Sequence, residues 1–333
     1  MNCETTQAIA NYAITLEGYD TATLEATADA TDPRVYTLRA LAAGDTTIGV
    51  RATVAGTLVV QKDVALSVLA RNKVEARGLW SNRWAFSGDK TQGPKDIAAI
   101  MTKAKNARFN QVYFQVRGTF DAYYDSRYEP WAARLSGSLG TDPGWDPLAV
   151  AIFEAHNRGL ELHAWINVFT LWAGTTQPTY PEHALRKYPG WVMCDASGTP
   201  MTALVDSYIW ASPGNAYVRQ HNTAVVADIA TRYEVDGVHL DRIRYPSVNY
   251  SHDEASVTAY TAALVERPGL SFADWEREQI VAQVAEMYAA LKEKAPKVAL
   301  SAAVIGIYKD AWGWGSVSEG YYDSLQDSRA FDA

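Results

Sequence analysis

One short run, at residues 235–246, reads Val235-Asp236-Gly237-Val238-His239-Leu240-Asp241-Arg242-Ile243-Arg244-Tyr245-Pro246. The apolar residues around His239 predict a buried strand, and the Asp236-Gly237 pair before them predicts a turn at its start. Because His239 and Asp241 are two residues apart, they lie on one face of that strand. The run therefore predicts a strand that ends in a carboxylate at its mouth.

On both sides of this run, short apolar strands alternate with helices of 3.6-residue periodicity. We predict strands at 78–80, 111–116, 160–166, 235–240 and 298–304. We predict helices after residue 94, after Asp146-Pro147, at 214–233, at 272–294 and near 318–330, with loops at 170–213 and 246–271. Repeated β-then-α units predict a parallel sheet with right-handed crossovers. The fold class is therefore an α/β, (β/α) TIM-type barrel that stops after about five to six of the usual eight strands.

Residues 1–72 have a different composition, rich in Thr, Ala and Val and without Trp. Alternating runs separated by turn signals predict strands at 35–40, 47–54, 57–60 and 64–68. This pattern predicts an N-terminal all-β sandwich domain, and it resembles bacterial immunoglobulin-like modules. We therefore expect a β-sandwich at 1–72, a linker at Arg71-Asn72-Lys73, and the barrel at 73–333.

The overall composition limits the partners of the protein. The chain has a net charge of −8 and no basic run, which disfavours nucleic acid. No stretch approaches the roughly 20 apolar residues of a membrane span. No dinucleotide or phosphate-loop motif is present, so no cofactor is predicted. The 11 Trp and 19 Tyr favour sugar as the partner, since their flat apolar faces carry a polar edge. Cys3 and Cys194 are too few and too distant to indicate a disulfide framework.

Active residues of (β/α) barrels lie at the carboxyl ends of strands, where Asp241 is the leading catalytic candidate. With Arg242 or Arg244 keeping it ionised, this carboxylate can act as a nucleophile or stabilise an oxocarbenium-like transition state. The alternative is a structural salt bridge with one of those arginines. A glycosidase also needs a second carboxyl group. The candidates are Asp121, Glu129, Asp310, Glu319 and Asp323, with Glu161 expected to point away from the site.

Polar and aromatic residues at the ends of the first four predicted strands are candidates for substrate binding. They are Trp80, Asn82, Trp84, Gln115, Arg117, His163, Trp165, Asn167, His239, Arg244 and Tyr245. His163 and His239 also permit two other interpretations, as core histidines or as metal ligands with Asp241. The His-x-Asp spacing alone is a weak metal signal, and no metal site is predicted.

Six ordered blocks also resemble one protein family. They are 77–80, 110–117, 121–124 with 129–131, 143–148, 154–167 and 235–246. Over about residues 76–333 the chain is similar to glycosyl-hydrolase-like family ten, formerly domain of unknown function 187. The resemblance implies a barrel glycosidase acting on bacterial or complex polysaccharide, with peptidoglycan glycan strands as one candidate, and it matches Asp241 to the family's strand-four aspartate. Two departures stand out: the family often has Asp-Asp where this chain has Asp241-Arg242, and the family barrel continues beyond the segment matching Tyr322–Phe331.

Three functions follow from these observations. The first is a glycoside hydrolase using carboxylate acid/base chemistry, the second a catalytically defective carbohydrate-binding relative, and the third a metal-dependent polysaccharide deacetylase. We expect an extracellular or cell-envelope location, reached with an export signal that this sequence does not show. An incomplete barrel leaves unpaired strand edges, so self-association through those edges is one expected outcome.

Overall fold

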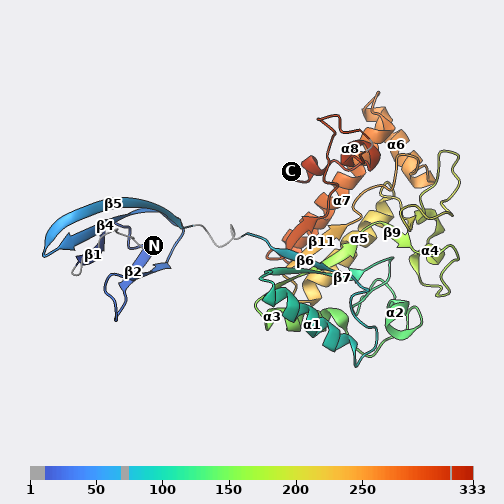
Figure 1. The fold of residues 1–333 in the computed structure, drawn as a ribbon. Helices are drawn as coiled ribbons and strands as arrows, with labels where there is room; N and C mark the ends of the chain where they lie inside the picture. Colours follow the sequence, from blue (N-terminus) through green and yellow to red (C-terminus); the bar gives the residue numbers. More distant parts are fainter. Residues whose placement is uncertain (1–11, 69–74, 316, 333) are drawn as a thin grey trace. The chain divides into compact units, whose positions relative to one another are not determined.

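The computed structural model describes residues 12–68, 75–315 and 317–332. The chain divides into two compact units, Met1–Ala76 and Arg77–Ala333 (Figure 1). The predicted linker Arg71-Asn72-Lys73, the predicted boundary after residue 72, and Cys3 lie outside the described residues. Each unit is described by itself below.

The smaller unit consists of antiparallel β-strands in two sheets. One sheet has the order β1-β4-β5 and the other pairs β2 with β3. The strands are β1 (Tyr12–Glu17), β2 (Leu24–Ala28), β3 (Tyr36–Ala40), β4 (Gly44–Val54) and β5 (Thr57–Val68). A two-residue turn joins β4 to β5, with positive φ at both Ala55 and Gly56, as the twist of a tight hairpin requires. The structure extends the prediction, because 57–60 and 64–68 form one strand and β1 and β2 are additional.

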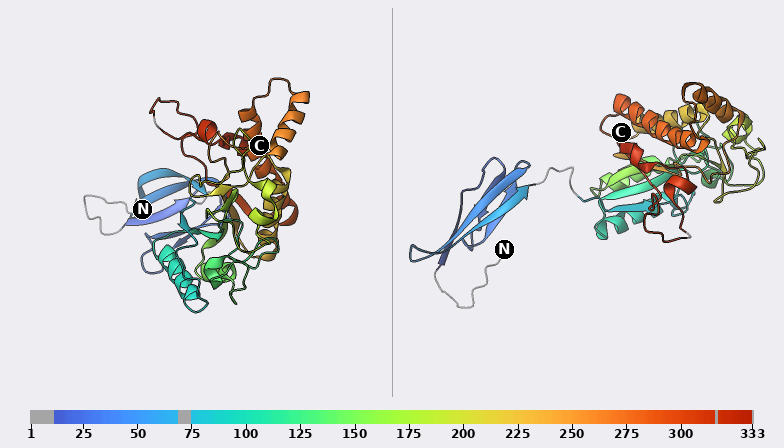
Figure 2. Two further views of the ribbon diagram at one scale, coloured as in Figure 1. Left: turned by 90° about the vertical axis from the view of Figure 1, so that its right-hand side faces the viewer. Right: turned by 90° about the horizontal axis from the view of Figure 1, so that it is seen from above.

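The larger unit is built on a five-stranded parallel sheet whose spatial order follows the chain, β6-β7-β8-β11-β12. The strands are β6 (Gly78–Ser81), β7 (Gln111–Arg117), β8 (Glu161–Asn167), β11 (Gly237–Asp241) and β12 (Ala299–Ala302). The helices that connect them are α1 (Gly93–Asn106), α3 (Pro147–His156), α5 (Ala216–Arg232) and α7 (Phe272–Lys294), which can be followed in Figures 1 and 2. Within the described residues, β6 and β12 are the edges of this sheet. Self-association through them stays a prediction.

The two faces of this sheet differ in chemistry. Val112, Phe114, Leu162, Val238 and Leu240 are fully buried on one face, where the connecting helices pack. The opposite face carries aromatic and polar side chains, which alternate with the first set along each strand. The register places Trp80, Tyr113, His163 and Gly237 in one row, with Gln115, Trp165, His239 and Ser301 in the next. This second face positions the candidate site.

Two segments predicted to be loops contain secondary structure. Segment 170–213 holds β9 (Thr170–Trp172), α4 (Ala184–Lys187), the 3₁₀ turn Pro189–Trp191, and β10 (Ile209–Trp210), which pairs with β9. Its core side chains, including Met193 and Trp210, are buried. Segment 246–271 holds α6 (Glu254–Glu266), capped by Asp253, which accepts from the Ser256 N–H. Sequence reasoning missed α6 because Ser256 is the one buried residue within it, so its apolar residues form no core-facing stripe.

The helix expected near 318–330 forms two short pieces. They are α8 (Gly320–Asp323) and the 3₁₀ turn Ser328–Asp332, separated by Leu325 at φ 48°. That left-handed residue reverses the chain and ends the helix. A further short helix, α2 (Ala133–Ser136), follows β7. In the described part of the chain, no helix combines the length and apolar character needed to cross a membrane.

Candidate active site

A row of polar side chains follows the carboxyl edge of the parallel sheet. Gln115 Nε2 donates to Asn167 Oδ1 at 3.1 Å, and Gln115 Oε1 accepts from the backbone N–H of Arg83 at 3.1 Å. Asn167 is in turn the register partner of Asp241 on β11. Gln115 and Asn167 are each 2% exposed, whereas Asp241 is half-buried. The row therefore ends in a carboxylate where the buried sheet meets solvent.

The backbone around Asp241 fixes the direction of its side chain. Asp241 Oδ1 accepts from the N–H of Arg242 at 2.7 Å, and Arg242 has a positive φ of 54°. The carbonyl of Asp241 accepts from Val168 at 2.8 Å, which ties the end of β11 to that of β8. Asp241 Oδ2 forms no hydrogen bond with the residues that the structure describes. One carboxylate oxygen is thus held while the other is open to a ligand.

The two arginines after Asp241 bind a different carboxylate from the one expected. Asp206 Oδ2 accepts from Arg244 Nη2 at 2.6 Å and also pairs with Arg242. Asp206 and Ser207 have positive φ between the paired Val205 and Tyr208, so a tight two-residue turn presents Asp206. Sequence reasoning missed Asp206, because an isolated Asp-Ser turn carries no signal of a partner 36 residues away. The site therefore holds two guanidinium groups, of Arg242 and Arg244, and two carboxylates, of Asp206 and Asp241.

Aromatic residues fill the inner face of the sheet below this edge. The Trp80 indole N–H donates to His239 Nε2 at 3.1 Å, and His239 Nδ1 contacts Ser301 Oγ at 2.9 Å. Tyr113 packs between them, with ring centroids 5.0 Å from Trp80 and 4.4 Å from His239. Burial, together with nearby His163, lowers the pKa of His239 to about 4. His239 is therefore a neutral core histidine with both ring nitrogens engaged.

His163 and Trp165, on β8, each bury a ring nitrogen that has no hydrogen-bond partner among the residues that the structure describes. These atoms are His163 Nδ1 and Trp165 Nε1. A Cβ at Gly237 would lie 2.2 Å from His163 Nδ1, so the neighbouring strand needs glycine there. Glu161, expected to point away, shares this face, since its Oε2 lies 3.4 Å from His163 Nε2. Alternation places residues 161, 163 and 165 together, at successive depths below the carboxyl edge.

Trp84 forms an exposed aromatic surface beside the end of β6. Its side chain is 62% exposed, and its backbone N–H is held by Asn82 Oδ1 at 3.0 Å. The guanidinium groups of Arg83 and Arg134 lie 5.2 and 5.0 Å from its ring centroid. Asn82 thus shapes the turn that displays Trp84, and the arginines hold the indole in place.

Glu129 and Arg117 lie away from solvent, in a buried ion pair. Arg117 Nη2 is 2.6 Å from Glu129 Oε1, with side-chain exposures of 0% and 2%. His221 Nε2 contacts the same oxygen at 2.8 Å. Burial alone would raise the pKa of Glu129, but Arg117 and His221 outweigh it and hold the pKa at about 2. Arg117 Nη1 also donates to the carbonyls of Asn167 and Val168, so the pair stabilises the end of β8.

The remaining predicted residues occupy two environments. Asp121 is 9% exposed, and its Oδ1 accepts from the Thr119 N–H at 2.7 Å and from the Thr119 hydroxyl at 3.2 Å. Tyr245, predicted to bind substrate, is fully buried, so its side chain is inaccessible to a glycan. The Tyr245 hydroxyl and Glu276 Oε1 are both buried and have no hydrogen-bond partner among the described residues. Burial raises the pKa of Glu276 to about 8. Asp121 follows β7 at the carboxyl edge, whereas Tyr245 belongs to the core.

Residues 75–332 match the protein family described as "Glycosyl hydrolase-like 10". The chain belongs to this family. One similar protein is the glycosyl hydrolase YngK of Bacillus subtilis (strain 168). It is 30% identical over 222 residues, which are 65% of this chain and 41% of the relative. Glycosyl hydrolase DigH of Escherichia coli (strain K12) is 29% identical over 205 residues, or 60% and 45%. This glycosyl hydrolase-like 10 chain therefore spans less than half the length of these relatives.

Solved structures identify the fold of the family member. Alpha-L-fucosidase isoenzyme 2 from Paenibacillus thiaminolyticus aligns with a TM-score of 0.51 and 16% identity, covering 71% of this chain and 34% of that one. The glycoside hydrolase domain of PgaB (BpsB) from Bordetella bronchiseptica aligns with a TM-score of 0.50 and 14% identity, covering 68% and 64%. At these identities the likeness concerns the fold alone, a parallel β/α sheet like that of these TIM-barrel neighbours.

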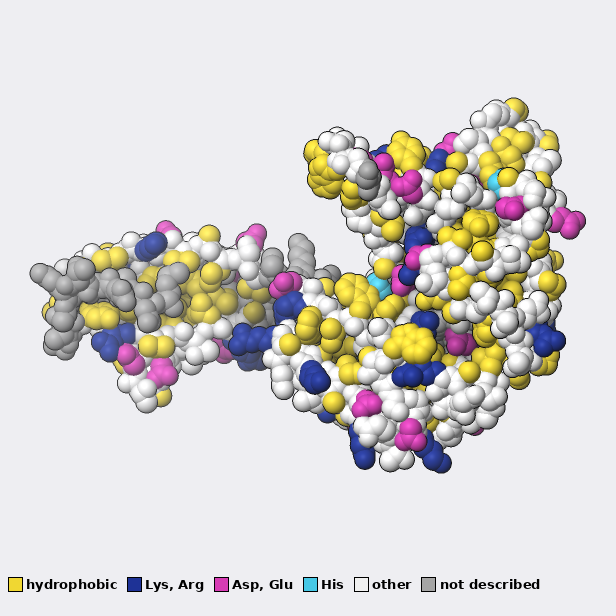
Figure 3. All heavy atoms as spheres, turned by 45° about the vertical axis from the view of Figure 1, so that its right-hand side comes forward, with side chains coloured by type: hydrophobic (Ala, Val, Ile, Leu, Met, Phe, Trp, Pro, Cys, Tyr) yellow, Lys and Arg dark blue, Asp and Glu magenta, His cyan; other side chains and the backbone are white. Residues whose placement is uncertain are grey.

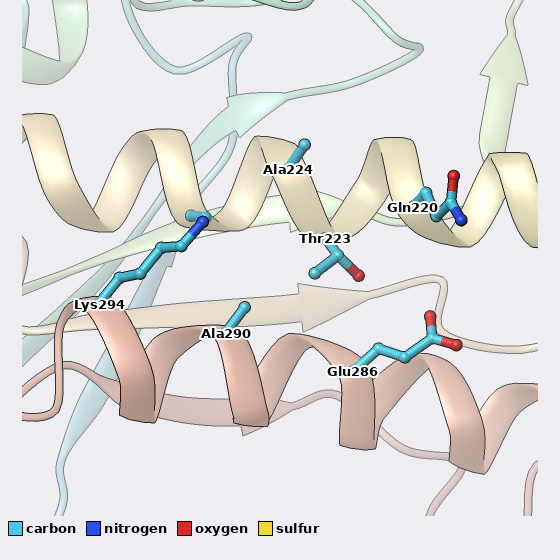
Figure 4. Close-up of a pocket in the computed structure, with 7 residues that line it drawn as sticks. Gln220, Thr223, Ala224, Glu286, Ala290 and Lys294 are labelled. Atoms are coloured by element: carbon cyan, nitrogen blue, oxygen red, sulfur yellow. The ribbon is translucent and has the colours of Figure 1, made fainter.

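A shallow groove of about 270 Å³ lies elsewhere in the glycosyl hydrolase-like 10 unit, between α5 and α7. Figure 4 shows Gln220, Thr223 and Ala224 on one helix facing Glu286, Ala290 and Lys294 on the other. The groove belongs to the helical layer and not to the carboxyl edge of the sheet, and its volume is below that of usual ligand pockets. Figure 3 shows a hollowed face of the larger unit with histidine, acidic and basic side chains inside the hollow.

Proposed function

We propose that this chain is part of a glycoside hydrolase that cleaves a bacterial or complex polysaccharide, with Asp241 as a catalytic carboxylate. One observation carries the proposal. Asp241 is half-buried at the carboxyl end of β11, with Oδ1 held by a backbone N–H. Its other oxygen is free to approach the anomeric carbon of a sugar. Membership of a glycosyl hydrolase-like family supports this chemistry.

Asp241 acts in the proposal as the charged carboxylate, either as a nucleophile or as the stabiliser of an oxocarbenium-like transition state. Asp121 is proposed as the second carboxyl group, since it also follows a strand at the carboxyl edge. Glu129 is not given that role. Its pKa of about 2 leaves no proton to donate near neutral pH, and its oxygens bind Arg117 and His221.

Trp80 and Trp84 are the proposed sugar contacts, because their indoles are 55% and 62% exposed. Arg244, beside Asp241, is proposed to bind a sugar hydroxyl or carboxylate. Peptidoglycan glycan strands are the proposed substrate, and an extracellular or cell-envelope site is the proposed location. The geometry disfavours the deacetylase alternative, because Trp80 and Ser301 engage both ring nitrogens of His239 and leave none to bind a metal.

The decisive experiment measures reducing ends released from peptidoglycan glycan strands stripped of their peptides. Asp241→Asn keeps the shape of the side chain and removes its charge, so turnover should fall at least about a hundredfold with an unchanged circular dichroism spectrum. Asp63→Asn, in the smaller unit, is the matched control and should keep full turnover. Full turnover by Asp241→Asn would contradict the assignment. Binding without turnover by the unmodified chain would instead favour a catalytically defective relative.

A further inference from the structure

A loop after β12 is closed at its base and tied to the candidate site. The N–H of Gly320 donates to Ile307 at 2.8 Å, and that of Tyr321 donates to Tyr308 at 3.0 Å. Between these two bonds, residues 309–315 and 317–319 form a loop, and the loop beside α8 stands out in Figures 1 and 2. The loop therefore leaves the body of the unit and returns to it at one point.

The base of this loop is anchored next to Asp241. Gln326 is 1% exposed; its Oε1 accepts from the Ile305 N–H at 2.8 Å, while its Nε2 donates to the Ile243 carbonyl at 3.0 Å. Tyr245 also donates its N–H to Ser324 at 3.1 Å. Because Ile243 is two residues after Asp241, the loop base is held at the same edge of the sheet as the candidate carboxylate.

A carboxylate holds the tip of the loop. Asp310 accepts from the N–H groups of Trp312 and Gly315, each at 3.2 Å. Gly313 and Gly315 have positive φ of 66° and 59°, which lets the backbone curl around the carboxylate. The Asp310 N–H itself donates to Glu319 Oε2 at 2.8 Å. Backbone hydrogen bonds thus order the tip without burying the side chains that it carries.

Those side chains are two tryptophans that face solvent. The rings of Trp312 and Trp314 stack with centroids 5.3 Å apart and an interplanar angle of 19°, and the residues are 73% and 62% exposed. Their mutual stacking uses one face of each indole and leaves the outer faces open. Two exposed tryptophans contribute little apolar burial to the stability of the fold. An exposed apolar surface of this kind is typical of a binding site, so we infer that they contact a ligand.

We propose that Trp312 and Trp314 form a docking platform for the sugar rings of a polysaccharide chain that continues from Asp241, an assignment that rests on the proposed function. The apolar C–H face of a pyranose packs on an indole face, and the indole N–H edge reaches ring hydroxyls. The platform therefore recognises the face of the sugar ring, which the N-acetylhexosamine units of chitin oligomers and of peptidoglycan glycan strands both present.

The test measures binding by calorimetry to chitohexaose and to peptide-free glycan strands, in an Asp241→Asn background so that turnover does not interfere. Replacing both tryptophans by Ala should weaken binding about tenfold. Replacing both by Phe keeps a ring and should restore most of the affinity. Tyr217→Ala is the matched control, since Tyr217 on α5 is 70% exposed, and it should bind like the parent.

Unchanged binding by the Ala pair, or no binding of either probe by the parent, would overturn the platform. So would a concentration-dependent dimer, seen by sedimentation, that the Ala pair abolishes without affecting glycan binding, since the loop would then dock a second copy. The result of this binding test can be distinguished from the result of the turnover test of Asp241. If Asp241→Asn retains turnover while the Ala pair binds weakly, the platform stands and the catalytic assignment fails.

Discussion

The Trp80 indole on β6 donates to His239 on β11 at 3.1 Å, although β7 and β8 lie between these strands. In a flat sheet, three strand spacings of about 4.8 Å would place the two backbones about 14 Å apart, beyond the combined reach of the side chains. The sheet must therefore curl toward its aromatic face. This curvature is what a segment of barrel wall requires.

Trp80→Phe should destabilise the larger unit by about 1–3 kcal/mol, because it leaves His239 Nε2 buried without a donor. The measurement is the urea midpoint followed by far-ultraviolet circular dichroism. Trp84→Phe is the control, because Trp84 is 62% exposed, and its loss should amount to at most about 1 kcal/mol. Equal shifts in the two variants would show that the Trp80–His239 bond does not hold the curved sheet together.

Glu129→Gln should destabilise the fold by about 3–5 kcal/mol, since Arg117 would remain buried without its carboxylate. Thermal unfolding at neutral pH measures the effect. The control is Glu182→Gln, whose carboxylate pairs with Lys187 at 2.6 Å with exposures of 59% and 43%. That exposed pair contributes about 0–1 kcal/mol. A small loss at Glu129 would mean that the ion pair is dispensable and would reopen a catalytic role for this residue.

Glu276→Gln should stabilise the protein at pH 8 and leave it nearly unchanged at pH 5. The folded pKa of about 8 is raised above the ordinary value of 4.5. Stability from the protonated acid is therefore complete below pH 4.5 and is lost as pH rises through 8. A pKa difference of one between the folded and unfolded states corresponds to about 1.4 kcal/mol. The free energy of unfolding of Glu276→Gln at pH 8 should therefore exceed that of the wild type by a few kcal/mol, as an order of magnitude.

The check is the denaturation midpoint of both proteins across pH 5–8.5. Glu266→Gln, at the exposed end of α6, should follow the wild-type curve. Parallel curves for Glu276→Gln and the wild type would show that Glu276 is ionised in the fold.

Sequence periodicity predicted the parts of the larger unit whose residues meet the core. Helix α7 begins and ends where predicted, at 272 and 294, and β7, β8 and β11 lie within one or two residues of their expected ranges. Periodicity reports burial, so it missed α6. It also could not show which partner a charge selects. Arg117 binds Glu129 and Arg244 binds Asp206, and both carboxylates lie on loops whose paths the sequence leaves undetermined. For that reason the expected ion pair between Asp241 and one of the arginines after it is not found among the described residues.

The order of the five strands has a consequence for synthesis. Because each parallel strand pairs with the one made just before it, the sheet can grow in step with the ribosome, one βα unit at a time. The Trp80–His239 bond follows a different rule, because it joins residues 159 positions apart on strands that are not neighbours. The Trp80 indole therefore lacks this partner while two further strands, β7 and β8, are added. The curvature is fixed only when β11 joins the sheet. A pause in translation before residue 239 would therefore leave an incompletely folded, aggregation-prone intermediate to which chaperones bind.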